Sequence, residues 1–358
     1  MTTLHVTRDL PPRIRGGIST GVGGLVSHQE GDVAVVSFDG WGPRRSGPAV
    51  VAEETLDGRT VTVCRLGGAD GLADARAFAV GLAPSRVVVH HAMLWRFGAG
   101  VARDVDAPAD LYVHVVQGAL RRARELDEPT GSERAQGMAL AEARRVYVPG
   151  EAARVLLGTV DVAAAERATI LPLPRPGPVP DRGLREPGRV LLVGRFDVLK
   201  GTADALDSLS FLIERAPGCR LVLAGGLPDN VRSERRWIRR WREEVPEVVA
   251  EHLEPLGWLG PDALSAELSR ASVVLAPSHM ETWGLAVLEA QAHGCPVVAS
   301  DIPAHREHIE HGVTGVLVPV GASEALAVAA AELLADPEGA RRIGAAARLT
   351  APGARPPA

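Results

Sequence analysis

Short apolar runs recur along the first half of the chain and alternate with stretches rich in alanine and arginine. The stretches at 70–82, 115–126 and 132–145 have the length and composition of helices. Runs rich in β-branched and aromatic residues indicate buried strands, and they occupy residues 4–6, 33–36, 61–63, 87–89, 111–113 and 146–148. Strands that alternate with helices predict a parallel sheet with helices on both faces.

The same alternation begins again after a proline-rich segment. Residues 171–180 contain five prolines, which keep the chain extended and stiff, so residues 171–182 are interpreted as a linker. Beyond this linker we predict strands at 190–193, 221–223, 273–275, 296–299 and 315–318, and helices at 202–215, 231–243, 263–270, 284–293, 304–310 and 323–335.

These elements predict an α/β chain of two doubly wound, Rossmann-like domains, 1–182 and 183–358. Ligands of such sheets bind beyond the carboxyl ends of the strands, so we expect the site in a cleft between the domains. Residues 348–358 are rich in proline and glycine and are expected to form a disordered tail.

Composition narrows the possible functions. A net charge of −5 argues against a nucleic-acid binder, whose phosphate contacts need a basic surface. Cys64, Cys219 and Cys295 are widely spaced and odd in number, so we expect buried thiols rather than disulfides or a zinc site. The N-terminus has no signal-peptide core, and no run approaches the roughly 20 apolar residues of a membrane span. We therefore expect a cytoplasmic protein.

The only lysine of the sequence, Lys200, lies just after the predicted strand at 190–193, in a segment that begins Gly194-Arg195 and ends Lys200-Gly201. A guanidinium can grip two phosphate oxygens and an ammonium acts as a compact charge, so the pair suits a diphosphate. Two surface cations near a helix start are the alternative interpretation.

A second candidate segment, 277–290, follows the strand at 273–275 and opens a helix. It carries Glu281 and Glu289, and Gly284 would let a ligand approach the backbone closely. The N–H groups at a helix start favour an anion, whereas carboxylates accept hydrogen bonds from hydroxyls such as those of sugars. A capped helix with a solvated glutamate is the alternative.

Taken together, these motifs resemble a known family. Residues 188–318 are similar to the donor domain of the family-four retaining glycosyltransferases, which have the GT-B fold. The resemblance rests on the two segments above, the spacing of Glu281 and Glu289, and further motifs at 221–226, 256–260, 294–300 and 312–318. The first half resembles the family through a glycine pair, Gly16-Gly17, and through His114 after the strand at 111–113.

The resemblance implies roles for individual residues. Arg195 and Lys200 would hold the donor diphosphate and stabilise the leaving group, Glu281 would hold sugar hydroxyls, and His114 would lie beside the transferred sugar. His90 and His91 are candidate acceptor contacts. The resemblance also implies further donor contacts, in which Glu289 would bind the ribose and Trp258 and Leu259 would border the base. The full set of these contacts is Gly16, Gly17, Gly194, Trp258, Leu259, Thr282, Trp283, Gly284, Leu285 and Glu289.

The implied activity is metal-independent transfer of a hexose, GlcNAc or glucose, from a UDP-sugar to a hydroxyl of a small polar acceptor, in specialised-metabolite or glycoconjugate biosynthesis. The nucleotide sugar is a co-substrate, and no cofactor is expected. GDP- and ADP-linked donors occur among relatives. A UDP-sugar epimerase of the same fold and a non-catalytic nucleotide-sugar-binding subunit remain as alternatives.

Other motifs suggest chemistry that we do not expect. Asp104-Val105-Asp106 has the D-x-D pattern of a metal site but is interpreted as a loop. His305, His308 and His311 are expected on a solvated helix face, because three-residue steps drift around a helix. The glycines of 21–24 lack the spacing of a dinucleotide loop. The basic segment 235–242 would suit an anionic membrane, but its tryptophans are expected to pack inward.

Overall fold

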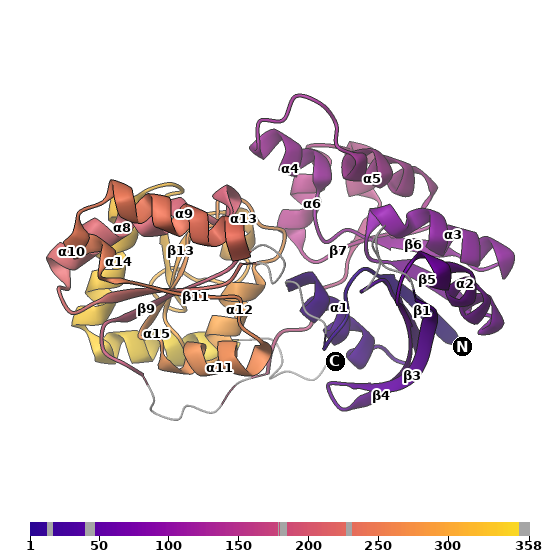
Figure 1. Cartoon of the computed structure of the whole chain (residues 1–358), viewed down its shortest axis with the longest axis horizontal. Coiled ribbons are helices and arrows are strands. Elements are labelled where there is room, and N and C mark those ends of the chain that lie inside the picture. Colours follow the sequence, from indigo (N-terminus) through magenta and orange to yellow (C-terminus); the bar gives the residue numbers. More distant parts are fainter. Residues whose placement is uncertain (13–16, 40–46, 178, 180–184, 227–230, 351–358) are drawn as a thin grey trace. The chain divides into compact units, whose positions relative to one another are not determined.

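The computed structural model describes residues 1–12, 17–39, 47–177, 179, 185–226 and 231–350. The chain forms two compact units, which we call unit 1 (Met1–Pro174) and unit 2 (Arg175–Ala358) (Figure 1). The division falls inside the proline-rich segment 171–182. Each unit is an α/β fold with its own sheet.

Unit 1 is built on an eight-stranded sheet of order β3-β4-β2-β1-β5-β6-β7-β8. All neighbouring strands are parallel except β3 and β4, which form an antiparallel hairpin at the edge. The strands are β1 (Thr2–Thr7), β2 (Asp32–Ser37), β3 (Ala49–Leu56), β4 (Arg59–Leu66), β5 (Arg86–Val89), β6 (Ala109–Tyr112), β7 (Val146–Val148) and β8 (Ala168–Ile170).

Helices lie on both faces of this sheet, as predicted for a parallel arrangement (Figure 1). They are α1 (Gly17–His28), α2 (Leu72–Gly81), α3 (Trp95–Asp104), α4 (Gln117–Ala123), α5 (Gly131–Glu142), α6 (Glu151–Gly158) and α7 (Val162–Glu166), with short 3-10 turns η1 (Ala69–Gly71) and η2 (Ala92–Leu94).

Helix α1 was not predicted, because a segment with so many glycines has a poor helix propensity. It forms because Val22 and Val26 pack into an apolar cluster with Val33 and Val35 of β2. Glycine has a packing role here: a Cβ on Gly21 would lie 2.8 Å from the side chain of Leu173. Burial of one apolar face thus outweighs the local preference of the sequence.

Unit 2 is built on a six-stranded, entirely parallel sheet of order β11-β10-β9-β12-β13-β14. Counted from β9, this is the 3-2-1-4-5-6 order of a doubly wound dinucleotide-binding sheet, with its switch point between β9 and β12. The strands are β9 (Arg189–Val193), β10 (Arg220–Ala224), β11 (Leu253–Gly257), β12 (Val273–Ala276), β13 (Val297–Ser300) and β14 (Val316–Val318).

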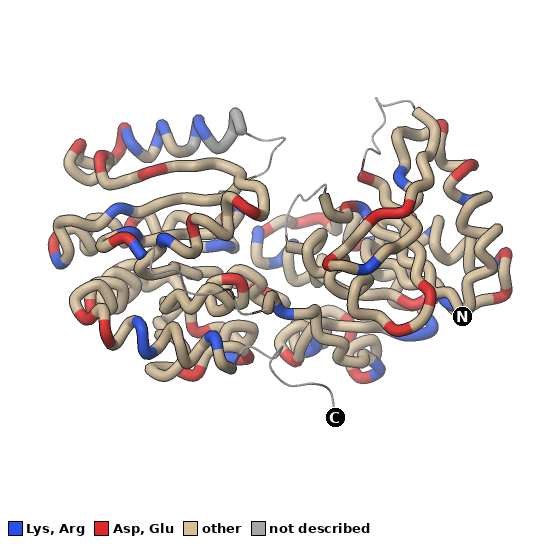
Figure 2. Tube along the Cα trace, turned by 90° about the horizontal axis from the view of Figure 1, so that it is seen from below, with Lys and Arg blue, Asp and Glu red and all other residues tan. Residues whose placement is uncertain are grey.

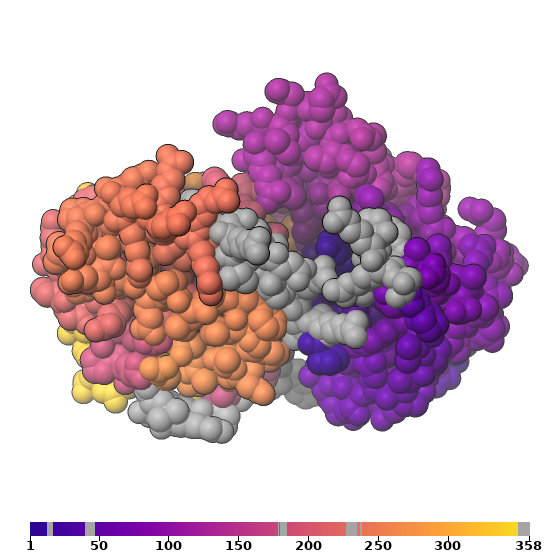
Figure 3. Space-filling view, in the orientation of Figure 1, coloured from indigo at the N-terminus to yellow at the C-terminus, as the bar shows by residue number. Residues whose placement is uncertain are grey.

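The helices of unit 2 cover its sheet, as the space-filling view of one face illustrates (Figure 3). They are α8 (Thr202–Arg215), α9 (Val231–Glu244), α10 (Glu247–Ala250), α11 (Pro261–Arg270), α12 (Leu285–Ala292), α13 (Pro303–Arg306), α14 (Ser323–Ala335) and α15 (Pro337–Thr350), with a 3-10 turn η3 (Val198–Lys200).

Two apolar layers hold the helices of unit 2 to the sheet. One joins β9 and β10 to α8 and α14, with Leu209 and Leu223 fully buried in it. The other joins the opposite face to α11 and α12 through Leu268 and Val287. Strands covered on both faces carry uninterrupted apolar runs, which is why the sequence reveals them clearly.

The C-terminal expectation is wrong in part. Residues 348–350 belong to α15, which packs against α12 and α14. Residues 351–358 lie outside the described part of the chain. A Cβ on Gly344 of α15 would lie 2.0 Å from the carbonyl oxygen of Gly294, so close contact of the helix with the segment after α12 requires glycine there.

Helix α9 contains the basic segment 235–242. Trp241 is buried and belongs to the apolar layer of α8 and α14, as predicted, whereas the side chain of Trp237 lies outside the described residues. Basic and acidic residues are interspersed over both units (Figure 2). Among the described helices, none combines the length and hydropathy needed to cross a membrane.

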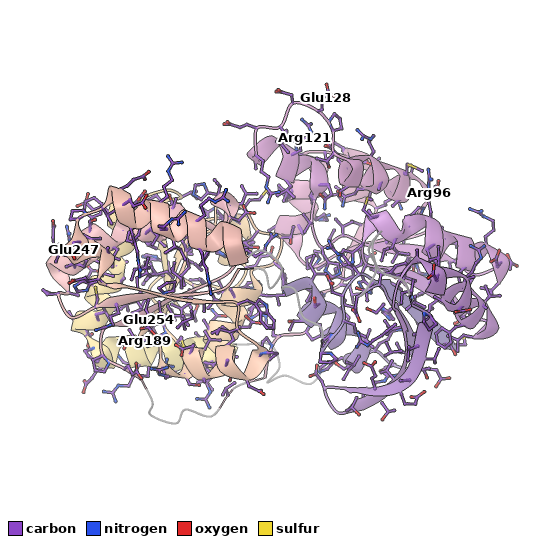
Figure 4. All side chains as sticks on the ribbon, in the orientation of Figure 1. Arg96, Arg121, Glu128, Arg189, Glu247 and Glu254 are labelled. Atoms are coloured by element: carbon purple, nitrogen blue, oxygen red, sulfur yellow. The ribbon has the colours of Figure 1, made fainter. Side chains whose placement is uncertain are left out.

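A buried ion-pair cluster lies at the amino-terminal edge of the unit 2 sheet. Arg189 begins β9 and pairs with Glu254 at 3.1 Å; both residues are labelled in Figure 4. Arg189 also pairs with Glu267 at 2.5 Å. The three side chains come from β9, β11 and α11, so the cluster ties strands and a helix together at the edge opposite to the ligand-binding edge.

Candidate functional site

Lys200 is positioned by a tight turn at the carboxyl end of β9. The side chain of Asp197 accepts a hydrogen bond from the backbone N–H of Leu199 at 3.0 Å and so caps η3. Gly201 follows in the left-handed region, with φ 63°, and starts α8. The turn reverses the chain at once, which leaves Lys200 at the strand end rather than along the helix.

The loop after β12 packs directly against this turn. The N–H of His279 donates a hydrogen bond to the carbonyl of Leu199 at 2.9 Å. A Cβ on Gly201 would lie 1.9 Å from the carbonyl oxygen of Pro277, so only glycine allows this approach. The two candidate segments therefore meet at the switch point of the sheet.

Lys200 and Glu281 form an ion pair where the segments meet. The hydroxyl of Ser278 donates a second hydrogen bond to the same Glu281 oxygen at 3.1 Å. Burial acts to raise the pKa of Glu281, but the Lys200 ammonium and these hydrogen bonds outweigh it and hold that pKa below its usual value. Glu281 is therefore ionised at neutral pH.

Glu289 has the opposite electrostatic character. It is partly buried and lies on α12, just over one turn after the first helical residue, Leu285. Burial raises its pKa to about 7, although the charge of Lys200 opposes this shift. One carboxylate at this site is thus firmly ionised and the other titrates near neutrality.

Lys200 and Glu281 line a small cavity of about 10 Å³, which has room for about one water molecule. Its polar lining comes from Lys200, Ser278, Glu281 and His305, and the rest is contributed by the strand ends and by the start of α12. A cation, an ionised carboxylate and helix-start amides at one strand edge can bind a ligand with phosphates and hydroxyls.

The start of α12 is rigidly held. Gly284 precedes the helix in the left-handed region, with φ 85°. The carbonyl of Trp283 accepts a hydrogen bond from Nε2 of His308 at 2.6 Å, and Nδ1 of His308 accepts one from Arg175 at 2.8 Å. The indole of Trp283 is buried, and the Arg175 guanidinium lies 5.9 Å from its centroid. Thr282 directly precedes Trp283, and Leu285 is the first residue of α12, so both lie next to these contacts in the sequence.

The predicted solvated face for His305, His308 and His311 is wrong for the first two. Both are buried, at 1% and 7% exposure, and α13 ends already at Arg306. Nδ1 of His305 donates a hydrogen bond to the carbonyl of Ser300 at 2.8 Å, and Nε2 of His308 donates one to the carbonyl of Trp283. These rings are drawn inward because they satisfy loop carbonyls, which the spacing of the histidines does not reveal.

The remaining donor candidates of unit 2 lie at neighbouring strand ends. Gly194 ends the run of β9, and its N–H donates to the carbonyl of Ala224. Arg195 is exposed, and among the described residues its guanidinium has no recorded contact with Lys200 or Glu281. Trp258, 37% exposed, and Leu259 follow β11, a strand that the sequence did not predict.

In unit 1, His114 and His90 belong to one buried cluster. Nδ1 of His90 lies 3.0 Å from Nε2 of His114, and Nε2 of His90 lies 2.8 Å from Nδ1 of His5. His91 is adjacent, and its Nδ1 accepts a hydrogen bond from the N–H of Arg8. His5 was missed, although a lone polar residue inside an apolar strand is a signal that the sequence does contain.

Other predictions for unit 1 have mixed outcomes. Gly17 is the first residue of α1, and Gly16 lies outside the described residues. Asp104 ends α3 and pairs with Arg76 at 2.7 Å, so the D-x-D segment begins inside a helix rather than in a loop. Within the described ranges no three His, Cys, Asp or Glu side chains are grouped as metal ligands. All three cysteines are buried, as expected, and none of them is joined in a disulfide.

Comparison with known proteins relates the site to a family. Residues 187–336 match the family described as Glycosyl transferases group 1. The chain is 35% identical over 162 residues to a glycogen synthase of Mycobacterium tuberculosis, and 34% identical over 171 residues to a D-inositol 3-phosphate glycosyltransferase of Thermobispora bispora. These alignments cover 45% and 46% of this chain and 37% and 39% of the two relatives. The chain is thus matched over less than half the length of either relative.

The fold is similar over a longer range. The crystal structure of Anabaena HepE in complex with UDP and glucose covers 98% of this chain, and this chain covers 94% of it, with a TM-score of 0.72 and 18% sequence identity. The architecture is that of the GT-B fold, so the predicted fold class is confirmed.

Proposed function

We propose that the protein transfers a hexose from a UDP-sugar to a hydroxyl of a small polar acceptor, with retention of anomeric configuration and without a metal ion. The premise of this proposal is that unit 2 is a group 1 glycosyl transferase domain. One observation carries the proposal: Lys200 and Glu281, far apart in sequence, meet at the switch point of the unit 2 sheet. Doubly wound sheets bind nucleotides at this point.

The diphosphate of the donor is proposed to lie between Lys200 and the start of α12. There Lys200 and Arg195 neutralise its charge, and the N–H groups of Gly284 and Leu285 point toward it because the first amides of a helix have no acceptor within the helix. Glu281 then holds sugar hydroxyls. In the absence of donor, Lys200 pairs with Glu281. When the donor binds, the Lys200 ammonium exchanges Glu281 for the donor diphosphate as its partner.

The other donor contacts follow the same order along the strand ends. Glu289 accepts hydrogen bonds from the ribose, and Trp258 and Leu259 border the base. Gly194, Thr282 and Trp283 shape the backbone around the phosphates and the sugar. By resemblance we also propose Gly16 and Gly17 as contacts of the diphosphate, His114 as a contact of the transferred sugar, and His90 and His91 as contacts of the acceptor.

The reaction proceeds on one face of the sugar. The bond between the anomeric carbon and the diphosphate oxygen breaks, the acceptor oxygen bonds to the same carbon, and the acceptor proton passes to the leaving phosphate. Lys200 and Arg195 stabilise the charge that develops on the leaving group; removal of one such donor typically costs a factor of roughly 10² to 10³ in turnover. Retention therefore requires no protein nucleophile.

UDP-glucose and a cyclitol or other polyol are the preferred substrates for testing. The resemblance to HepE, solved with UDP and glucose, supports the choice of nucleotide and of glucose. The resemblance to a D-inositol 3-phosphate glycosyltransferase supports a small polar acceptor. GlcNAc is the second sugar to be tested.

The test combines binding with turnover. Calorimetry should detect UDP binding, and UDP-glucose or UDP-GlcNAc should be consumed with a panel of polyols in the presence of EDTA. Lys200→Ala should lower turnover roughly 100-fold. Arg220→Ala should leave it unchanged, because Arg220 is exposed at the opposite edge of the sheet.

Three outcomes would overturn the proposal. Absence of UDP binding would remove the donor site, and UDP binding without transfer would indicate a non-catalytic subunit. Interconversion of UDP-sugars without an acceptor would indicate an epimerase. Loss of activity with EDTA and its return with Mn²⁺ would contradict metal independence alone.

A further inference from the structure

A cavity of about 420 Å³ lies within unit 1, at the amino-terminal ends of three neighbouring strands. Arg86 begins β5, Asp110 is the second residue of β6, and Arg144 and Arg145 directly precede β7. The three strands are parallel and adjacent in the sheet, so these residues share one of its edges (Figure 1). The volume falls within the range of about 300 to 1,000 Å³ that is typical of small-molecule pockets.

This cavity is separate from the site of the proposed reaction. The histidines proposed as contacts of sugar and acceptor follow the carboxyl ends of β5 and β6, whereas the cavity lies where these strands begin. The rest of its lining comes from Asp106, Ala107 and Pro108, in the segment between α3 and β6. All of its lining residues therefore belong to unit 1.

The carboxyl group of Asp110 lines the cavity and lacks a hydrogen bond on one oxygen. The residue is buried, at 1% exposure, and its Oδ1 accepts a hydrogen bond from the N–H of Arg145 at 3.1 Å. Oδ2 accepts none from the described residues; Nε of Arg86 forms an ion pair with it at 3.4 Å but does not donate a hydrogen bond. Buried polar atoms are nearly always hydrogen-bonded, so this oxygen indicates a missing partner.

The corresponding edge of unit 2 provides a contrast. There Arg189 donates hydrogen bonds to both oxygens of Glu254 and to Oε2 of Glu267, whose Oε1 accepts one from Arg270. Every carboxylate oxygen of that cluster has a guanidinium partner. Ion pairing within the chain therefore completes the edge of unit 2, but it leaves Oδ2 of Asp110 incomplete in unit 1.

The lining of the unit 1 cavity is basic. Its three arginines and two aspartates give it a formal charge of +1 at neutral pH. Arg144 and Arg145 are exposed, and Arg86 is partly exposed, so their guanidinium groups are accessible to a ligand. A phosphate monoester carries a charge of roughly −1.5 to −2 at pH 7 and three acceptor oxygens, which suits several guanidiniums better than a carboxylate does.

We propose that this cavity binds a small phosphorylated polyol. The phosphate contacts the guanidinium groups of Arg86, Arg144 and Arg145, and a hydroxyl of the ligand donates the missing hydrogen bond to Oδ2 of Asp110. The site goes beyond the proposed function, because its ligand bridges the starts of β5, β6 and β7 and takes no part in sugar transfer. Binding should therefore occur without any nucleotide sugar and should stabilise unit 1.

Binding can be measured on the full chain with sorbitol 6-phosphate as the probe. Calorimetry at low ionic strength should detect its binding, whereas inorganic phosphate and gluconate should each bind about tenfold more weakly and sorbitol should not bind. Absence of sorbitol 6-phosphate binding would refute the proposal. Equal affinity for inorganic phosphate would show an adventitious ion only, and equal affinity for gluconate would assign the cavity to carboxylates; either result would overturn the proposal.

Substitutions of exposed arginines locate the bound probe. Arg144→Ala should weaken binding about tenfold, and Arg144→Glu, which reverses the charge, should abolish it. Arg220→Ala is the matched control, because Arg220 is an exposed arginine at the corresponding edge of unit 2 and should not affect binding. Lys200→Ala, which alters the proposed donor site, should also leave it unchanged. Unaltered binding in Arg144→Glu, or loss of binding in Lys200→Ala, would place the ligand elsewhere and refute the proposal.

The contact with Asp110 has its own test. Asp110→Asn keeps an acceptor for the N–H of Arg145 but replaces Oδ2 by a neutral amide nitrogen. Inorganic phosphate should still bind, whereas the advantage of sorbitol 6-phosphate over it should shrink, because a hydroxyl bonds more strongly to a carboxylate than to an amide. An unchanged advantage in the folded variant would contradict the hydroxyl contact.

Hydrogen exchange of the unaltered protein provides a second measurement that does not depend on how Asp110→Asn folds. Sorbitol 6-phosphate should increase protection in peptides that contain residues 106–110 and 144–148, and protection confined to other peptides would overturn the proposal. None of these outcomes requires sugar transfer. Failure of the glycosyltransferase proposal would leave this site intact, and failure of this site would leave the glycosyltransferase proposal intact.

Discussion

At the scale of single residues, the site of unit 2 combines two carboxylates with different acidities. Glu281 is held ionised by Lys200, whereas the pKa of Glu289 is raised to about 7 by burial. Both are glutamates at one helix start, and only their surroundings distinguish them. A role for Glu289 as an acceptor of ribose hydrogen bonds therefore has a consequence for pH.

We predict that UDP-glucose binding strengthens as the pH rises from 6 to 8. Below about pH 7 Glu289 is protonated and must lose its proton to accept two hydroxyl donors, so affinity should fall by up to tenfold per pH unit. Calorimetry across this range measures the change; UDP-glucose is preferable to UDP, whose terminal phosphate also titrates. In Glu289→Gln the slope should vanish, and a slope that persists would assign the titration to another group.

The sequence anticipated part of this arrangement. It placed Lys200 and Glu281 after two strands of one parallel sheet, because apolar runs identify parallel strands and their carboxyl ends share an edge. It could not show that the two side chains pair directly, nor that Glu289 titrates near neutrality, because both depend on burial. His5 was missed for a related reason: a polar residue inside an apolar strand gains a meaning only when strand register reveals its partners.

At the scale of elements, the site depends on the close contact between the η3 turn and the loop after β12. Gly201 has a φ of 63°, and a Cβ there would lie 1.9 Å from the carbonyl oxygen of Pro277. The same glycine therefore meets two requirements, a left-handed backbone and an approach that no side chain permits. Its neighbour in sequence is Lys200, so displacement of the turn displaces the cation.

We predict that Gly201→Ala destabilises unit 2 by about 1–3 kcal/mol, through backbone strain and the collision with Pro277, and abolishes measurable UDP binding. Denaturant unfolding and calorimetry measure the two effects. Gly218→Ala is the matched control, because a Cβ there meets no atom within 4 Å. If Gly201→Ala were as stable as Gly218→Ala, the inferred contact between the two segments would be wrong.

Helices and strands could be predicted from the sequence where their burial leaves a regular pattern of apolar residues. The parallel strands at 190–193 and 273–275 are apolar throughout and were found, whereas β3 was missed because most of its residues are exposed at the sheet edge. Its hairpin does carry a signal: Asp57 and Gly58, both with positive φ, form the turn that favours Asp-Gly. Helix α1 was missed for the opposite reason, since its glycines serve packing rather than local preference.

At the scale of the whole molecule, the two units differ in how they hold ionisable groups. Unit 1 buries His5, His90 and His114 and partly buries His91, and lowered pKa values keep all four rings neutral at pH 7. Unit 2 also contains histidines of lowered pKa, such as His308, but Glu289 with its raised pKa acts in the opposite direction. Protonation should therefore affect the folding of the units unequally.

The sign of the effect in unit 1 follows from proton binding. An unfolded histidine takes up a proton near pH 6.5, whereas folded His5 and His91 do so only near pH 4. Between these values the unfolded state binds more protons, so the free energy of unfolding falls as the pH is lowered through this window. Each pKa unit of difference amounts to about 1.4 kcal/mol per group, which is large beside a typical domain stability.

We predict that unit 1 loses its protection at acidic pH before unit 2 does. Hydrogen exchange followed by mass spectrometry at pH 7.5, 6 and 5, corrected for intrinsic rates, resolves the two units by their peptides. Peptides of β1, β5 and β6 should lose protection between pH 6.5 and 5, whereas those of β9 and β12 should change less. Replacement of His5 by Asn removes one titrating ring and should flatten the pH dependence of unit 1 by about one proton, even if it lowers stability at pH 7.5. A pH dependence as steep in the variant as in the parent would mean that other groups govern the acid response.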